Sequence, residues 1–229
     1  MFKEFLHGVQ KGNGSESQLV KTILISLLTS FIVLAILYFT KFRFIEGFMG
    51  KYGFFLFFAV LTYALLSSVL VHMRCFGQFP CMSGMMLGMT VGMIAGFLPG
   101  YFVASTNGMF VGSVFGMAFG MTVGMIAGGK TCGIMGFLEG TMAGFMGGLM
   151  GSMTAFMLFN DNLKPATVIV FIVSAVILVA LNYMLYVEGK QMERKRHGDD
   201  SFFTIVFSFF ATVATTWLMV FGPRSGVFG

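Results

Sequence analysis

The nine-residue sequence GMTVGMIAG occurs twice in this chain, over residues 88–96 and again over residues 120–128. The second copy begins 32 residues after the first, and within each copy glycine and methionine recur at every fourth position. Residues four apart lie on one face of an α-helix. The segments around both copies are too apolar for helices of a water-soluble protein. The repeat therefore predicts transmembrane helices with faces made of glycine and methionine.

The composition of the whole chain supports the same class. Of its 229 residues 57% are hydrophobic and only 10% are charged, with a mean hydropathy of +0.89, whereas a soluble domain has about 25% charged residues. The sequence has no strand-like alternation of apolar and polar residues, which argues against a β-barrel. The net charge of +5 is concentrated in the predicted loops, where it serves orientation rather than nucleic-acid binding. We expect an all-α, polytopic helical protein of the cell (cytoplasmic) membrane.

About seven transmembrane helices are expected, tightly packed around a Gly/Met-rich core of helices three to five at residues 81–158. Residues 1–18 are expected to form a cytoplasmic, amphipathic N-terminal segment, and residues 19–229 a single transmembrane domain. The first apolar run is long enough to span and lacks a small-x-small exit, so no cleaved signal peptide is expected. The expected spans are 19–40, 52–71, 81–104, 108–128, 131–158, 166–186 and 202–221, with breaks at 105–107 and 128–130.

The distribution of Lys and Arg predicts the orientation. With seven spans, the side that holds the N-terminus has nine Lys and Arg residues and the other side has five. The N-terminus is therefore expected in the cytoplasm.

Glycine lines one face of each of the three central spans. In a bilayer, small residues at every fourth position let helix backbones approach closely. The pattern predicts tight packing within the chain or with homo-oligomer or complex partners, and by itself says little about function. The faces comprise Gly84, Gly88, Gly92 and Gly96, then Gly112, Gly116, Gly120, Gly124 and Gly128, then Gly136, Gly140, Gly144 and Gly148.

Methionine is concentrated in the same region, with 16 of the 21 methionines between Met73 and Met157. Leu, Ile or Val would fill such grooves with less side-chain entropy to lose. Thioethers, in contrast, are soft ligands that select Cu(I), although methionine also serves simply as a flexible space filler. Counted inward from the side of the second loop, the candidate ligands form layers: Met85, Met125 and Met135, then Met89 and Met121, then Met93, Met117 and Met142; Met146 continues the series.

Three cysteines and one histidine fall at the same predicted membrane face: His72, Cys75, Cys81 and Cys132. Cytoplasmic thiols stay reduced, so a structural disulfide is not expected there, and the cluster suits the mouth of a soft-metal path. If the orientation is inverted, Cys75 and Cys81 become candidates for a loop-closing disulfide. The cysteines can also be unrelated to each other.

Glu139 is the one acidic residue well inside an expected span. An ionisable group at that depth is a functional candidate. It can balance the charge of a cation, carry a proton, or remain neutral and hydrogen-bonded. The alternative is that the fifth span begins later, which would put Glu139 near the interface and beside Lys130.

The Met-x3-Met and Gly-x3-Gly patterns resemble the core motifs of the copper-uptake (Ctr) family. The resemblance covers only residues 85–93, residues 117–125 and the associated glycines, and that family has three spans per chain and forms trimers. It is thus a similarity of chemistry and spacing. No phosphate loop, catalytic triad or metalloprotease motif is found, so no enzyme is expected.

Three functional hypotheses follow. The first is binding or translocation of Cu(I) or Ag(I) along stacked thioethers, with Cu(I) as the bound ion. The second is a non-catalytic membrane subunit of a larger complex, in which the Gly/Met helices serve assembly. The third is a proton-linked channel or ring element that uses Glu139.

Overall fold

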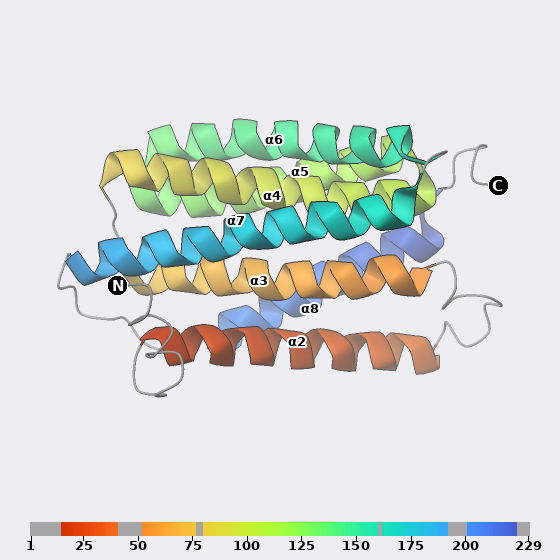
Figure 1. The fold of residues 1–229 in the computed structure, drawn as a ribbon, viewed down its shortest axis with the longest axis horizontal. Coiled ribbons are helices and arrows are strands. Elements are labelled where there is room, and N and C mark those ends of the chain that lie inside the picture. Colours follow the sequence, from red (N-terminus) through yellow and green to blue (C-terminus); the bar gives the residue numbers. More distant parts are fainter. Residues whose placement is uncertain (1–14, 41–51, 77–79, 160–161, 192–200, 224–229) are drawn as a thin grey trace.

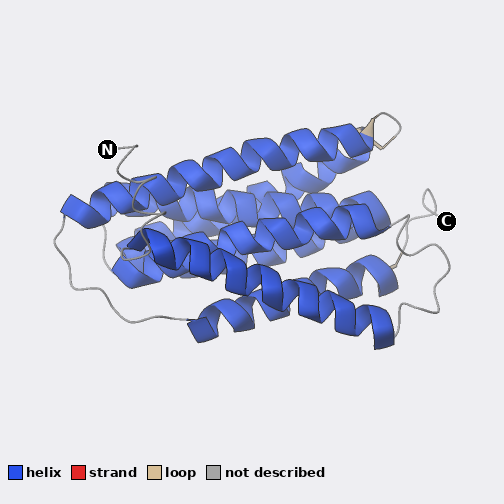
Figure 2. Ribbon diagram, turned by 60° about the horizontal axis from the view of Figure 1, so that its bottom comes forward, coloured by secondary structure: helices blue, strands red, loops and turns tan. Residues whose placement is uncertain are grey.

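The structure is a computed structural model that describes residues 15–40, 52–76, 80–159, 162–191 and 201–223. These residues form seven α-helices and no strand, as the sequence predicts (Figure 1). The helices run roughly along the long axis of the molecule (Figure 2). Their bounds are α2 (Ser15–Thr40), α3 (Phe54–Phe76), α4 (Cys81–Asn107), α5 (Met109–Cys132), α6 (Ile134–Met157), α7 (Leu163–Gln191) and α8 (Ser201–Phe221).

Six of these helices are long and apolar enough to cross a membrane, which supports an integral membrane protein. The exception is α6, whose 24 residues include many glycines and Glu139. At 1.5 Å per residue it is still about 36 Å long, enough for a bilayer core of about 30 Å. The predicted amphipathic segment lies outside the described residues, apart from the start of α2 at Ser15.

The chain reverses direction between the central helices at single glycines. Gly108 alone separates α4 from α5, and Gly133 alone separates α5 from α6. Their φ angles of 111° and 66° are positive, a conformation that favours glycine. The breaks predicted at 105–107 and 128–130 are therefore wrong. Polar residues and paired glycines resemble a loop in sequence, but there they continue the helix.

Helices α4, α5 and α6, which we call the glycine trio, pack at backbone distance. A β-carbon added to Gly88 would lie 2.8 Å from the Cα of Gly128, and one added to Gly100 would lie 3.0 Å from the carbonyl oxygen of Gly148. One added to Gly124 would overlap the carbonyl oxygen of Gly140. The predicted glycine faces thus meet along the shared axis of the three helices.

Helices α2, α3, α7 and α8, which we call the side-chain half, pack through larger groups. The hydroxyls of Ser26 and Ser208 lie 2.6 Å apart, and Thr212 donates to the hydroxyl of Ser30 over 3.2 Å. One face of α2 thus pairs with one face of α8. In Figure 1, α2 and α6 lie at opposite edges of the bundle, with α3 and α4 between them.

The two regions meet through aromatic and amide side chains. The rings of Tyr63 on α3 and Phe119 on α5 have centroids 5.8 Å apart. The hydroxyls of Tyr101 on α4 and Thr167 on α7 lie 3.1 Å apart. The buried Asn107 at the end of α4 donates its side-chain N–H to the carbonyl oxygen of Leu218 on α8.

Candidate functional site

In the part of the chain that the structure describes, exposed methionine is confined to the glycine trio. Among the described residues, eleven exposed large hydrophobic side chains are methionine, and all eleven belong to α4, α5 or α6. The exposed large hydrophobic side chains of α2, α7 and α8 are Leu, Ile, Val, Phe and one Trp. The trio also exposes hydrocarbon side chains, such as Phe110 on α5 and Leu138 on α6, so its outer surface mixes thioethers with hydrocarbon.

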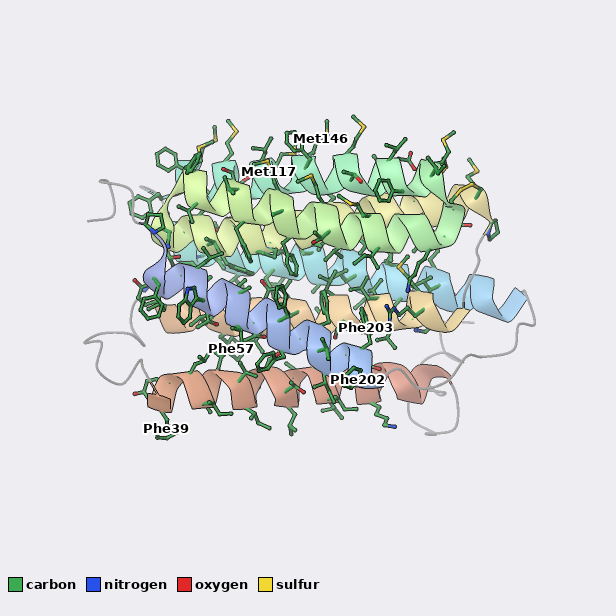
Figure 3. The ribbon with its side chains drawn as sticks, turned by 180° about the vertical axis from the view of Figure 1, so that it is seen from behind. Phe39, Phe57, Met117, Met146, Phe202 and Phe203 are labelled. Atoms are coloured by element: carbon green, nitrogen blue, oxygen red, sulfur yellow. A yellow bond between two sulfur atoms is a disulfide. The ribbon has the colours of Figure 1, made fainter. Side chains whose placement is uncertain are left out.

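Six of these methionines form a continuous stripe on α6. At 100° per residue they fall within an arc of about 80°, and their side chains are 46–66% exposed. Figure 3 shows the sulfur atoms gathered along this edge of the bundle, where Met146 points outward. We call this set the α6 stripe: Met135, Met142, Met146, Met150, Met153 and Met157.

The methionines of α4 lie beside the α6 stripe. A β-carbon added to Gly147 on α6 would meet the backbone of Met93, so this part of α4 borders α6 directly. Met93 and Met89 are 36% and 46% exposed, Met86 is also exposed, and Met85 is half-buried. The two helices run in the same direction, since Gly88 lies next to Gly136 and Gly100 next to Gly148. A single outer surface therefore carries thioethers from both helices.

The three candidate methionines of α5 are half-buried: Met117, Met121 and Met125. The backbone nitrogens of Met117 and Met121 lie where β-carbons on Gly148 and Gly144 would extend. Glycine rather than methionine thus fills the space between the three helices. The predicted thioether layers therefore lie around the outside of the trio. A methionine that follows a glycine of the glycine face is rotated by about 100° around the helix axis, away from the contact between helices.

Glu139 lies within the arc of the α6 stripe, in the second turn of α6. The residue is half-buried, and in the part of the chain that the structure describes its Oε2 atom is buried without a hydrogen-bond partner. Helix α6 begins at Ile134 rather than at residue 131, so Glu139 is about 8 Å from the helix start. It is therefore nearer the end of the span than predicted.

The cysteines are arranged differently from either prediction. Cys81 and Cys132 form a disulfide with their Cα atoms 5.0 Å apart, so the expectation of no disulfide is wrong for this pair. His72 is buried within α3, and Cys75 lies in the last turn of that helix, its side chain outside the described set. Among described side chains, no three His, Cys, Asp or Glu residues come together as metal ligands.

Sequence reasoning placed the cysteines at one membrane face but missed their pairing, which joins residues 51 positions apart. It also missed the last two residues of the α6 stripe, Met153 and Met157. Their spacing of three and four residues was the available signal.

The chain matches no known family model, no curated protein and no solved structure. Its function must therefore be inferred from the arrangement of its own side chains.

Proposed function

We propose that this protein binds a soft monovalent metal ion, Cu(I) or Ag(I), on the methionine surface of α6 and α4, and passes the ion along it. The observation that carries the proposal is the concentration of exposed methionine on α4 and α6. The exposed large hydrophobic side chains of α2, α7 and α8 include no methionine, whereas half of those on α6 are methionine. The others on α6 are Ile134, Phe137, Leu138, Phe145, Leu149 and Phe156. Burial in lipid explains the hydrocarbon side chains and gives no reason for the concentration of methionine.

The chemistry of the surface suits such an ion. A neutral, polarisable thioether binds Cu(I) and discriminates against hard cations such as Mg²⁺ or Ca²⁺. Methionines one helical turn apart are separated by about 5–6 Å along the axis, which favours movement between neighbouring sites. Glu139 would supply one negative charge beside the stripe and so offset the charge of the ion.

The proposed route follows the outside of the trio, because glycine backbones close its interior. A metal ion on the outer surface needs a cover against lipid. We propose a second copy of the chain or a partner subunit for this role, seated on α6.

Copper binding by the purified, full-length protein tests the proposal. We expect wild-type protein incubated with Cu(I) to retain copper, and the variant Met142→Leu/Met146→Leu/Met150→Leu to lose at least tenfold in affinity. Leu conserves volume and apolarity, so the variant should remain folded. The control is Met184→Leu/Met219→Leu, which changes one methionine of α7 and one of α8, neither of which belongs to the methionine surface of α4 and α6. Equal copper in all three proteins would contradict the proposal.

A second candidate is a non-catalytic membrane subunit in which α6 is a docking face. It is favoured by the position of α6 at the edge of the bundle (Figure 1). Many large side chains of α6 are exposed there. This function requires apolar area rather than sulfur. It predicts that the triple leucine variant keeps its partner and its activity in cells, whereas a charged substitution such as Met146→Glu loses both.

A further inference from the structure

Cys81 and Cys132 stand at one end of the methionine surface. Cys81 is the first residue of α4 and is exposed; Cys132 is the last residue of α5 and is half-buried. Both sulfurs therefore lie at a helix end, within reach of small molecules. Met82 directly follows Cys81, and Met135 lies three residues after Cys132; their side chains are 81% and 63% exposed.

The helices beneath the pair hold the two cysteines together. The Thr131 hydroxyl lies 3.0 Å from the carbonyl oxygen of Gly84 and 2.9 Å from that of Gly128, and donates to these oxygens. One turn deeper, Gly88 and Gly128 meet at backbone distance. Because these contacts do not involve sulfur, the separation of the two Cα atoms should persist when the disulfide is reduced. The pair is preorganised as a two-thiol site.

Positive charge lies close to this end of the bundle. Lys130 and Arg74 line a cavity of about 20 Å³ between α3, α5 and α8, together with Thr131, the residue before Cys132. The guanidinium carbon of Arg74 lies 3.5 Å from the centroid of the Phe203 ring, which fixes its position. Two cationic side chains therefore belong to the same end of the bundle as the cysteine pair.

We propose that Cys81 and Cys132 form a redox-controlled Cu(I) site that loads the methionine surface. Two molecules of a small thiol, such as glutathione, would reduce the disulfide. The first thiolate attacks one cysteine sulfur, forms a mixed disulfide and releases the other cysteine as a thiolate. The second thiolate attacks the small-molecule sulfur of the mixed disulfide, releases the second cysteine thiolate and forms a small-molecule disulfide. The reaction yields two protein thiols. Binding of Cu(I) then releases two protons and gives a bis-thiolate complex with a charge of −1.

The oxidised pair has no thiolate to offer, so oxidation would withhold Cu(I) from the surface. In the reduced state, the ion would pass from the two thiolates to the thioethers of Met82, Met85 and Met135. This loading role rests on the proposed function of the methionine surface, whereas binding by the two thiols can be tested by itself.

The test compares full-length protein in lipid nanodiscs after oxidation with diamide or reduction with a phosphine, each removed before measurement. Cu(I) is titrated in competition with bathocuproine disulfonate. We expect reduced wild-type protein to bind about one equivalent more than oxidised protein. The variant Cys81→Ser/Cys132→Ser should bind the smaller amount in both states. X-ray absorption should show two short Cu–S bonds for the additional ion.

Equal binding by oxidised and reduced wild-type protein would overturn the inference, as would two free thiols at Cys81 and Cys132 after oxidation. The triple variant Met142→Leu/Met146→Leu/Met150→Leu separates this inference from the proposed function. If the triple variant keeps only the redox-dependent ion, both stand. If it binds as much copper as the wild type in both states, the proposal that the methionine surface binds copper is refuted, and the proposal of a cysteine site remains.

Discussion

The glycine trio and the side-chain half solve the same packing problem by opposite means. In the trio, backbone meets backbone: an added β-carbon on Gly96 would lie 2.8 Å from the amide nitrogen of Gly148. In the side-chain half, contact is made by hydroxyls such as those of Ser26 and Ser208 and by aromatic rings such as Phe58 and Phe171, 5.1 Å apart.

The difference follows from the solvent. Lipid provides little hydrophobic drive for one helix to bind another, so association depends on close van der Waals contact and interhelical hydrogen bonds. Glycine gives close contact and leaves the outer faces of the helices available for other residues. In the trio those faces carry methionine together with hydrocarbon side chains, and in α2, α7 and α8 the exposed large hydrophobic side chains include no methionine. Tight packing and specialised surface chemistry thus coexist in one region.

The largest effect is expected for Gly128→Ala. The new methyl carbon would lie 2.6 Å from the carbonyl carbon of Gly136 and overlap its oxygen, so the helices must separate. We expect a loss of about 3 kcal/mol or more in the free energy of unfolding, measured by SDS titration in mixed micelles. The control is the neighbouring Gly129→Ala, where the nearest atoms are side-chain carbons of Phe137 at 3.6 and 3.7 Å. Wild-type stability for Gly128→Ala would refute backbone packing.

A smaller loss is expected where the two regions join. Asn107→Ala removes the N–H donor to the carbonyl oxygen of Leu218 and should lower the free energy of unfolding by about 1–3 kcal/mol. Thr106→Ala is the matched control, because its hydroxyl donates within α4 to Val103. If both variants unfold alike, Asn107 does not connect the trio to α8.

The turn at Gly133 should be sensitive to backbone conformation alone. No atom lies within 4 Å of a β-carbon added there, but its φ is +66°. We expect Gly133→Ala to cost about 1–3 kcal/mol. Gly133→Asn should cost as much, because the ψ of −138° lies outside the left-handed α region that Asn tolerates. The same SDS titration measures both, and a more stable alanine variant would argue against a turn at this residue.

The smallest effect is expected in the side-chain half. A double-mutant cycle of Ser26→Ala and Ser208→Ala should give a coupling energy of about 0.6 kcal/mol, typical of one interhelical hydrogen bond in a membrane. A coupling energy as large as the loss caused by Gly128→Ala would remove the contrast between the two regions.

Much of the fold could be predicted from the sequence, because hydropathy and helical spacing are local properties. The seven helices and the glycine faces, such as Gly120 to Gly128, required only these signals. The turns at Gly108 and Gly133 could not be predicted from the sequence, since a one-residue reversal of the chain depends on how the helices pack.

The candidate site was harder to predict. Methionine at every fourth position is compatible with an inward or an outward face, and packing around glycine decides between them. The pairing of Cys81 with Cys132 depends on the register of α4 against α5, which the sequence does not specify. The hydroxyl pairs of α2 and α8 were missed because Ser26 and Ser208 are isolated polar residues in apolar segments.

The modest hydropathy of α6 has a consequence for how the protein is made. A segment this rich in glycine, with a carboxylate in its second turn, partitions weakly from the translocon into lipid by itself. Its neighbours α4 and α5 precede it in synthesis and present the glycine faces on which it docks. Insertion of α6 should therefore be coupled to its assembly, and a defect in the glycine faces would leave this segment outside the bilayer, where quality-control proteases can reach it.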